Sequence, residues 1–110
     1  MIDWTRLHEL QEEVGVDDFQ EVVALFLEEA DEAVERLSPA LPADVLENDF
    51  HALKGSALNL GFSDLAQICA RAEKSAAAGD IGAIEFAAAS QTYAASKAAL
   101  SQKIGNADAA

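Results

Sequence analysis

The sequence predicts an all-α protein: an antiparallel up-and-down four-helix bundle with a short additional N-terminal helix. Apolar residues recur at the three- and four-residue spacing of a helix along most of the chain. The composition is rich in alanine and has only two prolines, which favours closely packed helices. The connections between the periodic segments are short, as they are between antiparallel neighbours in a bundle. A chain of 110 residues is one domain around one core.

The first helix is expected at residues 3–14. Asp3 is placed to cap it, because a short carboxylate before a helical pattern accepts the free N–H groups of the first turn. The apolar side of this helix holds Trp4, Leu7 and Val14. Gly15 follows the last apolar residue and is expected to end the helix.

The second helix is expected at residues 17–37, with Asp17 or Asp18 as its cap. Its apolar stripe consists of Phe19, Val22, Val23, Phe26, Ala30, Ala33 and Leu37. Leu25 lies off this stripe, in a place that the first helix could cover. The outer face is acidic and carries Glu21, Glu28, Asp31, Glu32 and Glu35.

The third helix is expected at residues 43–60. Pro39 and Pro42 break the chain before it, and Asp44 is its expected cap. Gly61 has the place of a C-terminal glycine cap.

The last two helices are expected at residues 63–78 and 80–103, with Ser63 and Asp80 as their caps. The inward side of the fourth helix is expected to hold Leu65, Ile68, Cys69, Ala72 and Ala76. The buried side of the fifth helix is expected to hold Ile81, Ile84, Ala88, Ala95 and Leu100.

Charge and composition limit the functions that the chain can have. The formal net charge of -13 argues against nucleic acid as a partner, because phosphates require a basic surface. Eleven of the twenty acidic residues lie between Glu9 and Glu35, where no lysine or arginine interrupts them. This run is either a solvated surface or a face that repels wrong partners while the site stays less acidic.

The chain also has the features of a cytoplasmic protein. No stretch approaches the roughly 20 apolar residues of a membrane span, and the N-terminus has no signal pattern. Cys69 is the only cysteine, so an internal disulfide is impossible, as expected in a reducing compartment. The domain is expected to span residues 1–105, and the small polar residues 106–110 are expected to form a flexible tail.

The stretch His51-Ala-Leu-Lys-Gly-Ser-Ala-Leu-Asn-Leu-Gly61 stands out chemically. The apolar arc of this helix is formed by Leu46, Phe50, Leu53, Ala57 and Leu60. At about 100° per residue, His51 lies roughly 140° from the centre of that arc, with Gly55 and Leu58 on the same outer side. Gly55 costs about 1 kcal/mol relative to alanine inside a helix, so we expect something to approach the backbone beside His51.

These residues carry a family resemblance. His51-x-Leu-Lys-Gly-Ser-Ala-x-x-Leu-Gly61 resembles the signature of histidine phosphotransfer (HPt) domains, the relay modules of two-component signalling. The resemblance covers nearly the whole chain, from Ile2 to the helix after the Gly79-Asp80 turn. The chain departs from the family pattern at Phe50, where many members have alanine.

The resemblance implies a phosphocarrier without kinase activity of its own. His51 would accept a phosphoryl group from the aspartate of a receiver domain, including that of a hybrid histidine kinase, and pass it to another receiver. The receiver would bring the aspartate and the Mg²⁺, so the chain itself needs no cofactor or metal. We expect a free-standing, monomeric protein.

Other residues near His51 have expected roles. The ammonium of Lys54 would attract the phosphoryl oxygens, and Gly55 and Leu58 would belong to the docking surface. In a helical hairpin that turns near Gly61, residues 71–74 lie level with His51. Arg71, Glu73 and Lys74 are therefore the candidates to contact its ring. His8 matches no motif, and the two histidines have no carboxylate at ligand spacing, so no metal site is expected.

Two alternatives stay open. One is a phosphotransfer-inactive fragment of a hybrid histidine kinase. The other is a helical adaptor that binds partners through its acidic face, which would keep the bundle but would not need His51, Lys54 and Gly55 together.

Overall fold

The computed structural model describes the backbone of residues 2–109 and the side chains of residues 2–103. Its elements are α1 (Trp4–Val14), α2 (Val16–Arg36), α3 (Ala43–Leu60), α4 (Ser63–Ala77), the short 3₁₀ helix η1 (Ile81–Ala83) and α5 (Phe86–Ala109). Within the described part of the chain, no helix is both long and apolar enough to cross a membrane.

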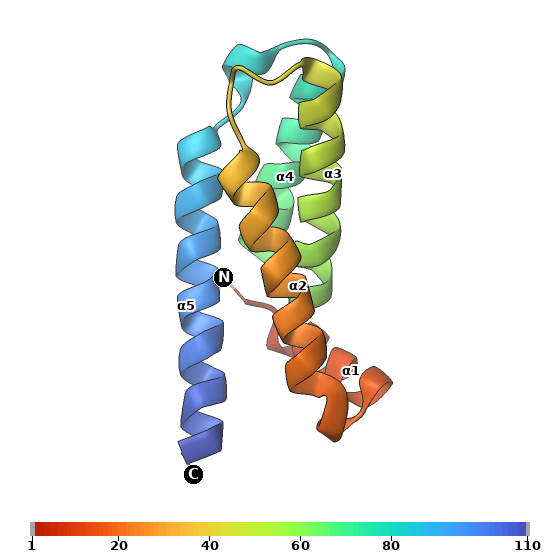
Figure 1. Ribbon diagram of the computed structural model, residues 1–110, viewed down its shortest axis with the longest axis vertical. Coiled ribbons are helices and arrows are strands. Elements are labelled where there is room, and N and C mark those ends of the chain that lie inside the picture. Colours follow the sequence, from red (N-terminus) through yellow and green to blue (C-terminus); the bar gives the residue numbers. More distant parts are fainter. Residues whose placement is uncertain (1, 110) are drawn as a thin grey trace.

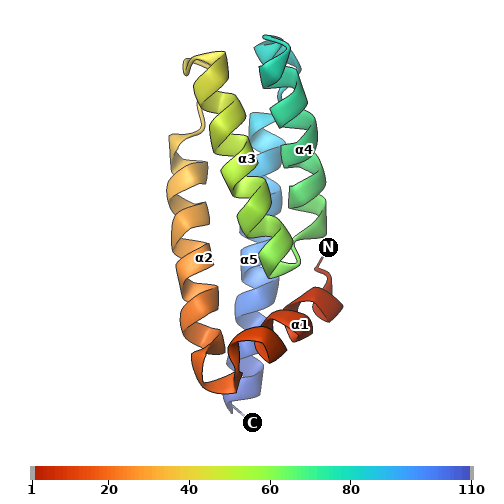
Figure 2. The same ribbon diagram turned by 90° about the vertical axis from the view of Figure 1, so that its right-hand side faces the viewer.

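The four long helices run alternately up and down along the long axis of the molecule (Figure 1). α3 and α4 form the most extensive helix pair, and α2 and α5 complete the bundle. α1 lies across one end of the bundle, against α2 and α3 (Figure 2). The predicted all-α bundle with a short N-terminal helix is therefore confirmed. Leu25 is an exception to the expected packing: α1 does not cover it, and it is 59% exposed.

The first four helices begin and end within one residue of the expected positions. Of their expected caps, however, only Asp3 acts as one, because its carboxylate accepts a hydrogen bond from the backbone N–H of Arg6 at 3.2 Å. α2, α3 and α4 begin without a side-chain cap, and the expected cap residues Asp17, Asp18, Asp44 and Ser63 lie inside the first turns. The helix dipole also favours a carboxylate inside the first turn. An acidic residue at the start of a helical pattern is therefore typical both of a cap and of a first-turn residue.

The prediction of one fifth helix at residues 80–103 was wrong at both ends. After η1 the chain is extended at Ile84, whose side chain enters the core, and α5 begins only at Phe86 and continues to Ala109. The buried side of α5 consists of Ala89, Tyr93, Ser96 and Leu100, whereas Ala95 is exposed. Because alanines occupy both sides of this helix, its sequence pattern has little contrast from which to choose the inner face. The expected tail, residues 106–110, is helical as far as Ala109, and its flexibility stays a prediction.

The chain before α1 is fixed to the turn between α3 and α4. The backbone N–H of Asp3 donates to the carbonyl of Gly61 at 2.6 Å, and Ile2 pairs with the buried Phe62. Gly61 has a φ of 73°, the left-handed conformation that closes α3. The backbone of Asp3 lies so close to Gly61 that a side chain at position 61 would collide with it.

A polar cluster joins α2 to α5. The Tyr93 hydroxyl and the Lys97 ammonium both bind the carboxylate of Asp31, the lysine at 2.9 Å from each oxygen. The Tyr93 hydrogen bond, together with Lys97, holds the pKa of Asp31 below its usual value. This cluster supplements a helix pair that has few other close contacts.

Candidate functional site

α3 places His51 in solvent because its opposite face is buried. The residues of the predicted apolar arc, Leu46, Phe50, Leu53, Ala57 and Leu60, are each at most 1% exposed. The side chain of His51 is 71% exposed. The expected outward orientation is therefore observed.

Glu73 on α4 is the residue that contacts the His51 ring. The Nδ1 atom of His51 lies 2.8 Å from Oε1 of Glu73 and 3.1 Å from Oε2. Arg71 and Lys74, the other two candidates, are exposed, and neither is bonded to His51 in the part of the chain that the structure describes. Their positions on α4 explain this, because side chains two residues before and one residue after Glu73 point in other directions around the helix.

Lys54 binds the same carboxylate. Its Nζ atom lies 3.1 Å from each oxygen of Glu73, and the Lys54 and Glu73 side chains are only 27% and 18% exposed. The hydrogen bond from His51, with a further contribution from Lys54, holds the pKa of Glu73 below its usual value, although partial burial acts in the opposite direction. Glu73 is therefore an ionised bridge between the imidazole and the ammonium.

Cys69 lies one turn before Glu73 on α4 and is fully buried, as the sequence indicated. Burial, with the nearby Glu73 carboxylate, raises the pKa of its thiol to about 12. A protonated thiol without solvent access is a poor nucleophile, which leaves His51 as the exposed nucleophile of this site. Among residues with described side chains, no group of three or more potential ligands is arranged to hold a metal ion.

The outer face of α3 beside His51 is open. A Cβ atom at Gly55 would meet no atom of another element within 4 Å, and Leu58 is 56% exposed. The Asn59 side chain donates to the carbonyl of Gly55 at 3.0 Å and accepts from Arg6 of α1 at 3.1 Å. Sequence reasoning missed this link between α1 and the site helix; the only signal for it was an asparagine four residues after the glycine.

Phe50, which departs from the family pattern, belongs to the core and not to the outer face. It is 0% exposed, and its ring lies 6.1 Å from that of Phe86 on α5, tilted by 51°. The Phe50 side chain therefore fills space between α3 and α5 and is not part of the surface around His51.

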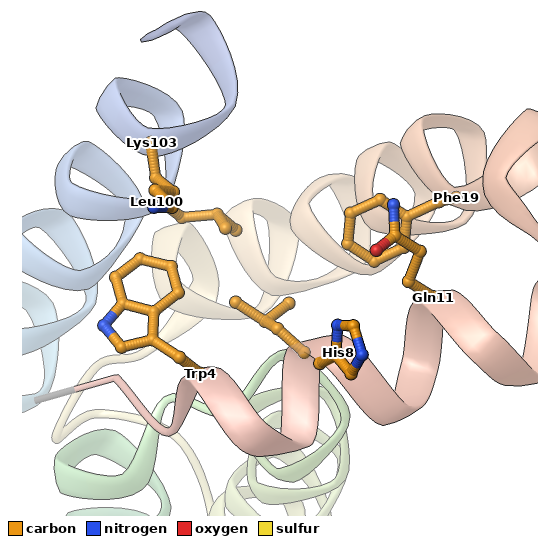
Figure 3. Close-up of a pocket in the computed structure, with 7 residues that line it drawn as sticks. Trp4, His8, Gln11, Phe19, Leu100 and Lys103 are labelled. Atoms are coloured by element: carbon orange, nitrogen blue, oxygen red, sulfur yellow. The ribbon is translucent and has the colours of Figure 1, made fainter. Parts of the chain in front are cut away.

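A larger cavity lies elsewhere, between α1 and the adjoining ends of α2 and α5 (Figure 3). It measures about 480 Å³, and its lining includes Trp4, His8, Phe19, Leu100 and Lys103. His8 at its edge lies 3.3 Å from Glu12, and both side chains are largely exposed. No member of the His51 site lines this cavity, so its size does not bear on the chemistry of His51.

Comparison with known families identifies the chain. The family model described as Hpt domain matches residues 21–109, which include α3, α4 and every residue of the site around His51. No curated protein and no solved structure matches the chain significantly. Since the family model covers most of the sequence, the chain belongs to the Hpt domain family, whose members carry phosphoryl groups in two-component phosphorelays and interact there with receiver domains and kinases.

Proposed function

We propose that this Hpt domain protein is a phosphorelay intermediate, in which His51 takes a phosphoryl group from the aspartate of one receiver domain and gives it to another. The observation that carries the proposal is the pairing of an exposed imidazole with a half-buried carboxylate, at 2.8 Å between Nδ1 of His51 and Oε1 of Glu73. The donor receiver would belong to a hybrid histidine kinase or stand alone, and the acceptor would be a response regulator.

The contact with Glu73 indicates which of the two ring nitrogens of His51 would accept the phosphoryl group. An ionised carboxylate only accepts hydrogen bonds, so Nδ1 of His51 must carry the proton that Glu73 accepts. In the neutral ring, this leaves the lone pair of Nε2 free for attack. Glu73 is therefore a positioning residue, which fixes the ring and its tautomer without touching the phosphoryl group.

The transfer step uses His51 as its only nucleophile from this chain. Nε2 of His51 attacks the phosphorus of the aspartyl phosphate, a nitrogen–phosphorus bond forms, and the bond to the aspartate oxygen breaks. The aspartate leaves as a carboxylate, and Nδ1 keeps its proton. The receiver supplies the Mg²⁺ that stabilises charge on the phosphoryl oxygens, and the second transfer is the reverse of the first.

Lys54→Ala is expected to slow single-turnover transfer from a phosphorylated receiver by about tenfold to a hundredfold. A cation beside the transferring group stabilises the charge of the transition state, and removal of one such group typically has an effect of that size. The loss of its partly exposed ion pair should lower the free energy of unfolding by about 1 kcal/mol or less. Lys74→Ala removes an exposed lysine that is not bonded to His51 and is the control; equal rates in the two variants would contradict the role of Lys54.

Glu73→Gln is expected to remove an acid-dependent part of the stability. The folded-state pKa of Glu73 lies below its usual 4.5, so its contribution is fully present above that value and is lost as the pH falls through the lowered pKa. The parent and Glu73→Gln should therefore differ most in unfolding free energy at about pH 7. This difference should become smaller as the pH is lowered to about 3, as measured by urea unfolding. Glu28→Gln, at an exposed carboxylate, is the control. A difference that stays constant with pH would mean that Glu73 is not held as an ionised bridge.

Gly55 and Leu58 are proposed to form the surface on which the receiver docks. Gly55→Gln should be at least as stable as the parent, because glycine is a poor helix residue and the space at position 55 is open. The free energy of unfolding should rise by up to about 1 kcal/mol. Transfer should nevertheless slow by tenfold or more, because the new side chain stands where the receiver approaches His51. Ala98→Gln, at an exposed position of α5, is the control for thermal melting and transfer. Parental transfer rates in Gly55→Gln would show that close approach is not the reason for this glycine.

The proposed function is tested by incubating the protein with a panel of phosphorylated receiver domains and measuring acid-labile phosphate on the protein. Labelling by at least one receiver, and none by ATP alone, is the expected result for a phosphocarrier. Receiver binding without labelling would favour the helical adaptor, and neither binding nor labelling would favour an inactive fragment of a hybrid kinase. We further propose a cytoplasmic monomer, which cell fractionation and sedimentation would check.

A further inference from the structure

A second feature of the site helix is a groove on its other flank, where α3 packs against α2. The groove measures about 210 Å³, and its lining includes Glu29, Glu32 and Arg36 of α2 and Ala52, Leu53 and Ser56 of α3. Ala52 directly follows His51 in the chain, so the groove opens beside the proposed docking surface. Its volume is below the roughly 300–1,000 Å³ of small-molecule sites, which makes it suited to the end of one side chain.

The groove carries uncompensated negative charge. Glu29 and Glu32 are both exposed, and neither forms an ion pair with any residue whose side chain is described. Arg36, the cation among the described residues of the lining, is already bound to Asp49 at 3.3 Å. The floor between these charges is apolar, with Ala52 and Leu53. An occupant that complements this lining would have an apolar stem and a cationic end.

The groove also contains a hydroxyl group that is free to bond an occupant. Ser56 is only 6% exposed and lines the groove, and no hydrogen bond of its hydroxyl is found within the described part of the chain. The second oxygen of Asp49, the partner of Arg36, does not line the groove; it is buried and has no hydrogen-bond partner among the described residues. The Ser56 hydroxyl is not one of the buried unpaired atoms, so solvent in the groove reaches it, and it is free to bond a polar group that enters the groove.

We propose that the groove receives an arginine side chain of the receiver domain that docks on His51. A guanidinium offers five N–H donors in a planar fork, enough to meet the carboxylates of Glu29 and Glu32 and the hydroxyl of Ser56 together. A receiver that reaches Nε2 of His51 covers about 800 Å² of this protein, which extends over the neighbouring Ala52. The inference rests on the proposed function, because it requires a receiver in that place.

The test compares two double variants that remove the same two negative charges from α2. Glu29→Gln with Glu32→Gln changes the groove, whereas Glu28→Gln with Glu35→Gln changes two exposed carboxylates that do not line it. Calorimetric titration with a receiver that binds the parent should show affinity about tenfold weaker for the groove variant, and within twofold of the parent for the control. Arginine-to-alanine substitutions on that receiver should include one that weakens binding to the parent but not to the groove variant.

The outcomes separate the two proposals. If both double variants weaken binding equally, only net charge matters and the groove proposal is overturned, whether or not phosphate is transferred. If a lysine of the receiver, and no arginine, shows the coupling, the groove takes an ammonium and the proposed arginine is wrong. If the receiver binds the parent with the predicted groove dependence but transfers no phosphate, the groove stands and the relay function fails. If no receiver binds, both proposals fail.

Discussion

His51→Gln is expected to abolish phosphate incorporation from every receiver that labels the parent. The reason is chemical: the glutamine amide has no nucleophilic lone pair comparable to that of imidazole, and Cys69, one turn before Glu73, is a buried thiol. The bundle should stay folded, because His51 is 71% exposed and belongs to no apolar contact of the core. The measurement is retention of acid-labile label on the protein, together with far-ultraviolet circular dichroism.

His8→Gln is the matched control for this experiment. It removes the other histidine of the chain, which is exposed on α1 and bound to Glu12. This variant should label as the parent does. Label that survives in His51→Gln, or that disappears in His8→Gln, would assign the phosphoryl group to a different residue from the one proposed.

Gly61→Ala is expected to have the largest effect on stability of any change outside the core. The left-handed backbone at φ 73° costs a residue with a Cβ roughly 1–2 kcal/mol. In addition, the new Cβ would collide with the backbone carbonyl of Asp3, a residue held in place because its backbone N–H donates to the Gly61 carbonyl. Relief of that collision must displace the chain before α1. We expect a loss of at least about 3 kcal/mol in the free energy of unfolding, measured by urea titration.

Gly79→Ala separates the two contributions. Gly79 has almost the same conformation, with φ 76°, but a Cβ there would meet no atom of another element within 4 Å. This control should lose only the conformational cost of about 1–2 kcal/mol. Equal losses in the two variants would mean that the collision with Asp3 is relieved without a measurable cost in stability.

The sequence was sufficient to predict the parts of the fold and site that depend on helical periodicity. The apolar arc of α3 placed His51 in solvent, and the hairpin at Gly61 placed residues 71–74 level with it. Periodicity does not say which side chain of a neighbouring helix turns toward a given ring. Glu73 was therefore only one of three candidates before its direction around α4 was known.

Other features had no clear signal in the sequence. α5 has alanines on its inner and its outer side, so the sequence pattern did not indicate which side is buried. The extended backbone at Ile84 before this helix also had no clear sequence signal. The contact of Arg6 with Asn59 joins residues that are 53 positions apart in the chain. The groove beside Ser56 can be predicted only when the distance between α2 and α3 is known. Such contacts depend on tertiary packing, which a one-dimensional pattern does not contain.

The position of Trp4 gives the protein a built-in optical reporter. It is the only tryptophan of the chain, it is 46% exposed on α1, and its ring lies 5.9 Å from the ammonium of Lys103 on α5. Its fluorescence emission therefore depends on the seating of α1 against α5, whereas far-ultraviolet circular dichroism reports mainly on the four long helices. Recording both signals during one heating experiment would distinguish local detachment of α1 from global unfolding in a single unlabelled sample.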